Sequence, residues 1–147
     1  DATMRILIDT KEQAPWHFGN FFDDPDYGTV RCNLATGDYS LAGYQDLICV
    51  ERKSLSDLVK SVVTDWQRFS RECRRMAAMD VAVIVVEAPV TALMDQKYDG
   101  AINPKSVRGK LNRILLDFGV PTIFLDNRTL ATEWVYNLFE QFMERRK

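Results

Sequence analysis

The sequence has few residues of the kinds that build the commonest catalytic and metal sites. Its 147 residues include one histidine, His17, and three scattered cysteines without metal-ligand spacing, Cys32, Cys49 and Cys73. A histidine-based zinc site is therefore disfavoured, and so is a catalytic role for His17. We interpret the cysteines as reduced structural thiols of a cytosolic protein.

Long hydrophobic runs are also missing. No stretch of about 18 apolar residues occurs, so we expect no membrane-spanning helix. The chain opens without the cationic and apolar leader of a secreted protein. Residues 1–3 precede Met4 and the apolar run that follows it, and we interpret them as an expression remnant. Residues 4–147 are long enough for a single domain with a sizeable core.

The chain has no excess of positive charge either. Its formal net charge is −2, which argues against a general polyanion binder. The charges are unevenly distributed, because residues 1–57 carry ten acids and five bases, whereas residues 58–147 carry eleven acids and fourteen bases. Acids that could hold a cation are thus concentrated in the first part, and bases that could meet phosphates in the second.

Residues 37–57 are the most informative stretch. Two short apolar runs, 39–42 and 47–50, flank the turn-like residues 43–46, and this arrangement is typical of a β-hairpin. With the turn centred in the middle of 43–46, opposed residues have numbers that sum to 89. Directly opposed residues have Cβ atoms about 4.5–5.5 Å apart and point to the same face of the sheet.

This register places two carboxylates, Asp38 and Glu51, opposite each other. Like charges in that position are destabilising unless a cation lies between them. Side-chain alternation puts Lys53 on the same face and Arg52 on the other. Oxygen ligands without histidine or cysteine favour Mg²⁺ or Mn²⁺ over zinc, so Asp38 and Glu51 are candidate metal ligands.

The predicted arrangement of Asp38, Glu51 and Lys53 suits the hydrolysis of a phosphodiester bond. A Mg²⁺ ion held by one or two carboxylates keeps several waters, accepts a substrate phosphate and acidifies a bound water. The same ion stabilises charge that develops on the phosphoryl group. Lys53 would either orient the attacking water or neutralise the developing oxyanion. An acid two residues before a lysine is common, and its opposition to Asp38 makes the pattern more specific.

The remaining segments predict an α/β domain. Asn103 and Pro104 begin a helix that ends before Gly119, and Ser54 and Thr64 each open a capping box. The order strand, strand, strand, helices, strand, helix, strand, helix indicates a mixed sheet with helices on its faces. The predicted strands are 4–8, 29–34, 39–42, 47–50, 81–86 and 122–125, and the predicted helices are 55–62, from the Thr64 box to about 79, 104–118, and from about 129 onward.

The end of the first strand leaves two interpretations open. Asp9 either contributes to a site or caps a turn. The residues from Asp9 to Gly28 are rich in proline, glycine and aspartate, and a loop of this length is usually functional or mobile.

Basic residues on two predicted helices are candidates for phosphate binding. Arg68, Arg71 and Arg75 share one helix face at i, i+3 and i+7. That face is either simply solvated or forms a ridge that contacts nucleic-acid phosphates. Lys105 and Arg108 lie on a later helix, and we add them to the candidate DNA-binding residues.

The last predicted helix is unusually apolar. Its large residues are Leu130, Trp134, Leu138 and Phe142 on one side, with Tyr136, Phe139 and Met143 widening the arc. An arc of this width fits either the core alone or a subunit interface.

The central stretch resembles a known family motif. Gly37-Asp38, followed by Glu51-Arg52-Lys53 and by Asp57, is similar to the G-D-x(n)-E-R-K-x(3)-D motif of the XPF family of structure-specific endonucleases. Residues 8–12 are similar to the upstream I-D-x-R-E of that family, with lysine in place of the usual arginine. The resemblance is specific over the first eighty or so residues and looser to the end. It implies a restriction-endonuclease-like fold of the PD-(D/E)xK type.

The resemblance also implies roles for individual residues. Asp38 and Glu51 would bind Mg²⁺ or Mn²⁺ and take part in catalysis. Lys53 would be the catalytic lysine, and Asp9 is a further catalytic candidate. Glu12, Arg52 and Asp57 would support the site or hold DNA. The helix-strand-helix from Pro104 is similar to the part through which the family dimerises, so we expect a homodimer.

The expected function is therefore a metal-dependent DNA endonuclease that acts on branched DNA or at junctions of single and double strands, in repair or recombination. The expected location is the cytoplasm or nucleoid of a microbial or viral host cell, or the nucleus of a eukaryote. The 147 residues contain neither the helix-hairpin-helix module nor the helicase of other family members. Two alternatives are a same-fold restriction, resolvase or exonuclease activity, and a non-catalytic DNA-binding subunit.

Overall fold

A computed structural model describes residues 4–21 and 28–147 of the protein. The predicted remnant at 1–3 and part of the predicted loop, residues 22–27, lie outside the described residues. Among the described residues, none of the helices combines the length and the apolar character that crossing a membrane requires.

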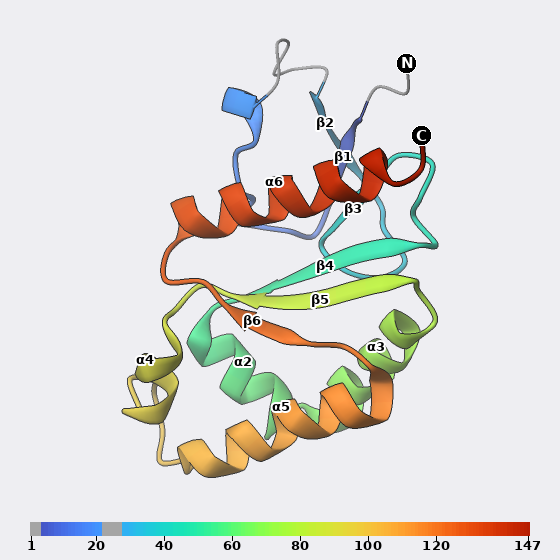
Figure 1. The fold of residues 1–147 in the computed structure, drawn as a ribbon. Helices are drawn as coiled ribbons and strands as arrows, with labels where there is room; N and C mark the ends of the chain where they lie inside the picture. The colour runs from blue at the N-terminus through green and yellow to red at the C-terminus, as the bar shows by residue number, and fades with distance from the viewer. Residues whose placement is uncertain (1–3, 22–27) are drawn as a thin grey trace.

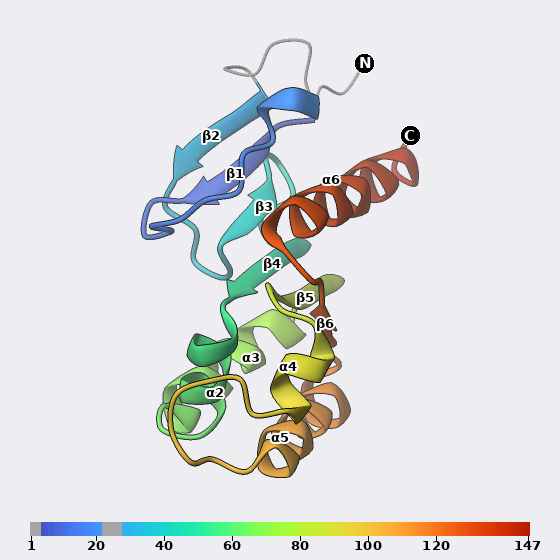
Figure 2. The ribbon, with the colours of Figure 1, turned by 90° about the vertical axis from the view of Figure 1, so that its left-hand side faces the viewer.

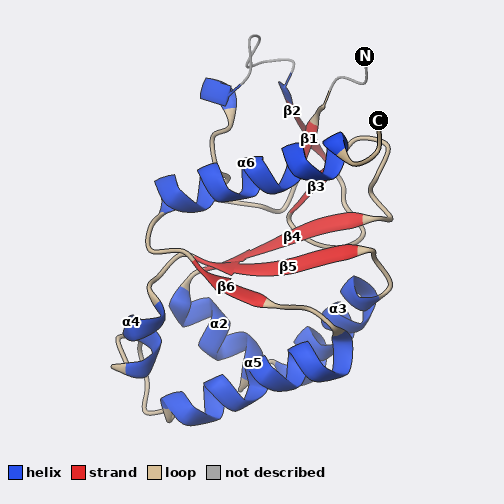
Figure 3. Ribbon diagram, in the orientation of Figure 1, coloured by secondary structure: helices blue, strands red, loops and turns tan. Residues whose placement is uncertain are grey.

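A six-stranded mixed sheet lies at the centre, in the order β2-β1-β3-β4-β5-β6 (Figures 1 and 3). β3 is antiparallel to both of its neighbours, and the other adjacent strands are parallel. The strands are β1 (Ile6–Asp9), β2 (Thr29–Cys32), β3 (Tyr39–Leu41), β4 (Ile48–Lys53), β5 (Val81–Val86) and β6 (Thr122–Phe124). The helices are η1 (Gly19–Phe21), α2 (Leu55–Val62), α3 (Trp66–Ala77), α4 (Val90–Met94), α5 (Pro104–Phe118) and α6 (Arg128–Glu144).

Alternating side chains of β4 and β5 divide the core into two layers. Cys49 and Ile84 pack in a cluster with side chains of α2, α3 and α5, whereas Val50 and Val83 pack in a second cluster with α6. Figure 2 shows α6 on one side of the sheet and the other long helices on the opposite side. The apolar run at 81–86 is thus a strand covered on both faces, as predicted.

The hairpin has the predicted register. Tyr39 of β3 pairs with Val50 of β4, so that opposed numbers sum to 89. The amide of Asp38 donates to the carbonyl of Val50 at 2.9 Å, which continues the pairing by one residue. Gly37 precedes it with φ +78° and packs against Cys49. The backbone therefore turns sharply where the first carboxylate of the candidate site begins.

The segment after β1 contributes to the core, although the sequence predicts only an irregular loop. Trp16 and Phe18 are each 1% exposed, while His17 between them is exposed. The Trp16 amide donates to the Tyr39 hydroxyl at 2.9 Å, and the two rings stack with centroids 4.6 Å apart. Two alternate aromatic anchors thus fix a segment that has almost no regular secondary structure.

The N-terminal caps are partly as predicted. Ser54 accepts a hydrogen bond from the Asp57 amide and begins α2 at the predicted residue. The capping box predicted at Thr64 does not form, because Asp65 is the N-cap of α3 and its carboxylate pairs with Arg68 at 3.2 Å. The short helix α4 is not predicted, since its five residues are too few to show helical periodicity.

Two apolar segments are only partly buried. β6 is a half-buried strand at one edge of the sheet. On α6 the buried face includes Val135 and Phe139, whereas Trp134 is 53% exposed and Leu130 is 36% exposed. The helix has more large apolar residues than positions that face the sheet, so Trp134 and Leu130, about 100° and 140° around the helix from Val135, remain outside.

We expect Gly37→Ala to destabilise the protein more than Gly43→Ala. Both glycines have positive φ, at +78° and +87°, so alanine costs about 1–2 kcal/mol at either position. A Cβ at Gly37 would lie 2.8 Å from Cβ of Cys49, whereas the space around Gly43 is open. We expect this overlap to add about 1–3 kcal/mol to the loss at Gly37. Urea unfolding of the two variants measures the difference, and equal losses would contradict the packing argument.

Candidate active site

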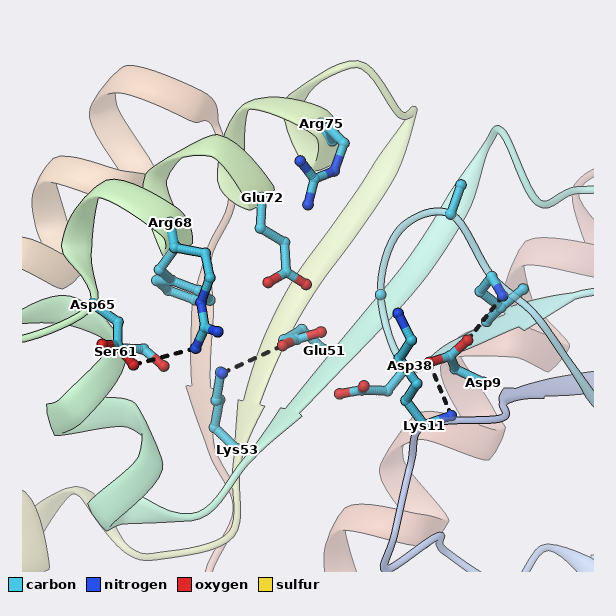
Figure 4. Close-up of a pocket in the computed structure, with 14 residues that line it drawn as sticks. Asp9, Lys11, Asp38, Glu51, Lys53, Ser61, Asp65, Arg68, Glu72 and Arg75 are labelled. Atoms are coloured by element: carbon cyan, nitrogen blue, oxygen red, sulfur yellow. Dashed lines mark hydrogen bonds and ion pairs between the residues drawn. The ribbon is translucent and has the colours of Figure 1, made fainter.

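The residues just before β3 and the end of β4 line a cavity of about 360 Å³. Asp38, Glu51 and Lys53 all line it, together with Asp9 at the end of β1 (Figure 4). Helix α3 forms the facing wall. The structure therefore brings the two opposed carboxylates and the lysine of the hairpin to one place, with room for a phosphate group beside them.

Lys53 is held close to Glu51. Its Nζ lies 3.4 Å from a carboxylate oxygen of Glu51 and 4.8 Å from the ring centroid of Phe69 on α3. The two side chains that form the ion pair are only 16% and 8% exposed. The ammonium group is therefore fixed at the cavity by an acid on one side and an aromatic ring on the other.

Hydrogen bonds orient the two aspartates. One carboxylate oxygen of Asp38 accepts from the backbone amide of Arg52 at 2.8 Å. The two oxygens of Asp9 accept from the amides of Leu34 at 2.9 Å and Lys11 at 3.2 Å. Asp9 thus fixes the turn after β1 and also lines the cavity, so both interpretations of this residue have a structural basis.

Arg52 forms an ion-pair network away from the cavity. Its guanidinium donates to both carboxylate oxygens of Glu12, at 2.7 and 2.8 Å, and to Glu87 at 2.6 Å. Arg128, the first residue of α6, lies 3.8 Å from the other oxygen of Glu87 and also donates to the carbonyl of Ala14. The network joins β4, the segment after β1, the end of β5 and α6.

The network shifts the pKa values of Arg52 and Glu12 in the directions that favour their charged forms. Hydrogen bonds with Glu12 and Glu87 raise the pKa of Arg52 despite its partial burial. Burial by itself would raise the pKa of Glu12, but the Arg52 guanidinium and the Ala14 amide outweigh it and lower this pKa. The sequence indicates Glu12 and Arg52 by resemblance, whereas Glu87 and Arg128 carry no signal without the fold.

The two carboxylates of the cavity behave in the opposite way. Burial raises the pKa of Asp38 to about 6, although the Arg52 amide works against the shift. Burial and the nearby charges of Asp38 and Glu72 raise the pKa of Glu51 well above its ordinary value, and Lys53 compensates only in part. The fold thus holds like charges in a poorly solvated place where their repulsion is not balanced.

Glu72 of α3 is a further acid of the cavity, and it is not among the residues predicted from the sequence. It lines the cavity, and Figure 4 shows its carboxylate directed toward Glu51. A signal is present in hindsight, because Glu72 lies four residues after Arg68 and three before Arg75, on the helix face that carries the predicted arginines.

The remaining predicted residues divide into two groups. Arg68 and Arg75 line the cavity, and Arg71 lines the adjacent hollow at the α2–α3 turn. Lys105 and Arg108 are exposed on α5 and are not among the residues that line the cavity. Asp57 is likewise exposed outside it, where its amide completes the cap of α2.

The donor set fits a hydrated magnesium or manganese ion. No group of three or more histidine, cysteine or acidic residues within 4–21 and 28–147 is arranged to hold a metal ion. Mg²⁺, however, needs only one or two protein carboxylates and keeps several waters, which the open cavity can accommodate. Burial raises the pKa of the Cys49 and Cys73 thiols to about 12, so they are neutral and poor zinc ligands.

We expect Asp38→Asn to stabilise the metal-free protein at high pH. The folded pKa of Asp38, about 6, lies above its unfolded value, so its contribution to stability is lost as the pH rises through 6. Asparagine keeps the acceptor for the Arg52 amide but carries no charge. From the size of the shift, we expect the variant to gain about 2–3 kcal/mol over the wild type at pH 8 and little at pH 4.

Urea unfolding in EDTA at pH 4, 6 and 8 measures this gain. Asp46→Asn is the matched control, because Asp46 belongs to the same hairpin but is exposed. A gain from Asp38→Asn that is equal at pH 4 and pH 8 would show that the buried charge is not its cause.

Comparison with known proteins supports the fold and the family. XPF from Aeropyrum pernix has a similar structure, with a TM-score of 0.74 and 22% identity, over 96% of this chain and 66% of that one. The same archaeal protein in complex with DNA gives a TM-score of 0.72 at 22% identity, with the same coverage. This likeness confirms the predicted restriction-endonuclease-like fold with a mixed central sheet flanked by helices.

A Methanocaldococcus jannaschii protein that carries the name of an ATP-dependent RNA helicase is 26% identical over 145 residues. The match covers 97% of this chain but 16% of that protein, so the chain spans a small part of the length of this relative. The ERCC4 domain matches residues 8–138, which include the hairpin, the cavity and most of α6. This chain therefore belongs to the ERCC4 domain family, the nuclease family of XPF that its hairpin motif resembles.

Proposed function

We propose that the protein is a metal-dependent DNA endonuclease. The observation that carries the proposal is the convergence of Asp38, Glu51 and Lys53 on one cavity, where burial raises the pKa of both carboxylates. Carboxylates with raised pKa values are functional-site candidates, because the structure maintains an arrangement that destabilises it. A divalent cation supplies the missing positive charge, activates a water and accepts phosphate oxygens.

The residues of the chain have separate roles in the proposed reaction. Asp38 and Glu51 would hold the cation, and Asp38 is oriented for this by the Arg52 amide. Lys53, fixed between Glu51 and Phe69, would donate to the attacking water or to a phosphate oxygen as negative charge develops. Arg68 and Arg75, which also line the cavity, would bind the phosphates next to the one that is cut.

The proposed substrate is branched DNA or a junction between single and double strands, as in repair and recombination. Its support is the family, together with the similar archaeal XPF whose structure contains DNA. A same-fold restriction, resolvase or exonuclease activity remains the alternative for the target. A non-catalytic DNA-binding subunit is less consistent with the structure, because Asp38, Glu51 and Lys53 of the motif are all present and line one cavity.

We expect Asp38→Asn and Lys53→Ala each to reduce DNA cleavage at least about a hundredfold, since each removes a charge that acts in the transition state. DNA binding should survive in both variants, because the arginines of α3 are intact. Labelled flap, fork, four-way-junction and linear DNAs, incubated with Mg²⁺ or with EDTA, measure the cleavage and its target. Lys60→Ala is the matched control, because Lys60 is an exposed lysine on α2.

Several outcomes would contradict the proposal. Cleavage that persists in EDTA would remove the role of the metal, and equal loss of cleavage and binding would remove the assigned roles of Asp38 and Lys53. Cleavage of the linear DNA in preference to the branched substrates would favour the alternative target, and no cleavage of any substrate would favour the non-catalytic subunit.

We also propose that two copies associate through α5, β6 and α6. β6 has a partner strand on one side only among the described residues, and the helices beside it expose apolar side chains. Leu115 on α5 is 46% exposed, and Leu130 and Trp134 on α6 are 36% and 53% exposed. On α6 these two lie on the side opposite Tyr136, which stacks on Phe21. An edge strand between two apolar helix faces suits a second copy of the same surface.

We expect Trp134→Ser to shift the protein from dimer to monomer, because it removes the largest exposed apolar side chain of this surface. Size-exclusion chromatography with light scattering measures the molar mass over a range of concentrations. Val90→Ser is the matched control, since Val90 is 51% exposed but lies on α4. A wild-type protein that is monomeric, or a Trp134→Ser variant with unchanged mass, would contradict the proposed interface.

A further inference from the structure

Three surface hollows follow one another around helix α3. The cavity with Asp38 shares Asp65 and Arg68 with a second hollow at the α2–α3 turn. The second hollow shares Trp66 with a third, which lies between α3 and α5. The three are therefore contiguous, and we call the surface outside the cavity the α3 track. Its basic and aromatic lining consists of Trp66, Arg68, Arg71, Arg74, Arg113 and Phe118.

The lining of the α3 track has four arginines and two acids, Asp65 and Asp117, although the chain as a whole is slightly acidic. Within their bounds, α3 and α5 carry one acid each, Glu72 and Asp117. Glu72 lines the cavity, and Asp117 pairs with Arg113 at 3.3 Å. The bases of the two helices are Arg68, Arg71, Arg74, Arg75, Lys105, Arg108, Lys110 and Arg113. A phosphate chain is the polyanion that such a surface attracts next to a phosphodiester-cleaving site.

Aromatic rings hold several of these cations in place. Nζ of Lys110 lies 4.3 Å and Cζ of Arg113 lies 5.4 Å from the ring centroid of Trp66. Cζ of Arg74 lies 6.0 Å from the ring centroid of Phe118. A cation that rests on a ring loses conformational freedom while most of its N–H groups remain available to phosphates. A guanidinium plane also provides a surface on which a nucleobase can stack.

The course of the α3 track distinguishes a single strand from a duplex. Arg68 lies about 200° around α3 from Trp66, so the surface follows the helix through about half a turn. A DNA duplex has a persistence length of about 50 nm and does not bend around one α-helix about 10–12 Å wide. A single strand is flexible enough to follow this path.

We propose that the α3 track binds a single-stranded DNA segment that continues from the cavity to the groove between α3 and α5. The inference rests on the proposed nuclease function and adds the path of one arm of the substrate. Arg113 and Leu115 lie about 200° apart around α5, so the track stays open when Leu115 contacts a second copy.

The test compares a fork that has single-stranded arms with a blunt duplex of the same paired sequence. Both are fluorescein-labelled and are titrated by anisotropy in the non-cleaving Asp38→Asn background. We expect Arg74→Ala/Arg113→Ala to weaken fork binding about tenfold and to lower its salt slope by about 1.4, the value for two single-strand phosphate contacts. Binding of the blunt duplex should not change. Arg145→Ala/Lys147→Ala, which removes two exposed charges from the end of α6, is the matched control.

Trp66 tests the part that the aromatic ring plays. Its ring packs against the core, so Trp66→Phe is used to keep the fold, and thermal unfolding verifies that it does. We expect an intermediate loss of fork affinity, because phenylalanine binds cations more weakly than tryptophan does.

The outcomes separate this inference from the proposed function. Unchanged fork binding by the arginine variant, or an equal loss with the blunt duplex, would overturn the α3 track alone. A loss of fork affinity of the same size in Arg145→Ala/Lys147→Ala would show a general effect of charge and would also overturn the α3 track. If the Asp38→Asn protein without further substitutions binds neither DNA, the proposed function is overturned together with the track.

Discussion

The pairing of β3 with β4 is the constraint on which the candidate site depends. The contact between Tyr39 and Val50 fixes which residues of the two strands are opposed. A slip by one residue would move Glu51 and Lys53 to the other face of the sheet, among the residues that pack against α6. Two hydrogen bonds secure the register beyond the ladder, because the Asp38 amide donates to the Val50 carbonyl and the Asp38 carboxylate accepts from the Arg52 amide. The side chain that would bind the cation thus also closes the hairpin.

This arrangement is electrostatically unfavourable, and the structure compensates for it on the opposite side of the strand. Burial and mutual repulsion raise the pKa values of Asp38 and Glu51, so their ionised forms destabilise the fold. Arg52 lies between Glu51 and Lys53 on β4 and faces away from the cavity, where it binds Glu12 and Glu87 in ion pairs of 2.7 and 2.6 Å. Side-chain alternation along β4 therefore places carboxylates whose charges are not neutralised on one face of the sheet and a neutralised ion-pair network on the other. Sites at which one local rule is broken are commonly compensated elsewhere in the structure.

Local sequence signals predict much of the fold and the centre of the site. The hairpin register, the Ser54 cap and the α5 boundaries follow from turn chemistry, side-chain alternation and capping, which act over a few residues. The missed features depend on contacts between distant segments. Glu72 joins the site only because α3 forms the wall of the cavity that faces Glu51, and Glu87 meets both Arg52 and Arg128 only in the folded chain. The buried face of α6 could not be chosen from the sequence, because its apolar arc is wider than the sheet can cover.

Helix α3 shows how a chain with net charge −2 could hold a phosphate chain next to a cluster of acidic residues. Its inner face contributes Phe69 to the support of Lys53, and the next turn contributes Glu72 to the acidic cluster. Arg68 and Arg75 flank that cluster on the same helix, so a phosphate chain that followed this helix would meet a base on either side of the acids. Without a divalent cation the carboxylates of the cavity would repel the phosphate that the arginines attract, and a bound cation would offset that repulsion at short range. In the proposed nuclease, binding and cleavage would therefore depend on different charges, so a single helix could serve both without a strongly basic protein.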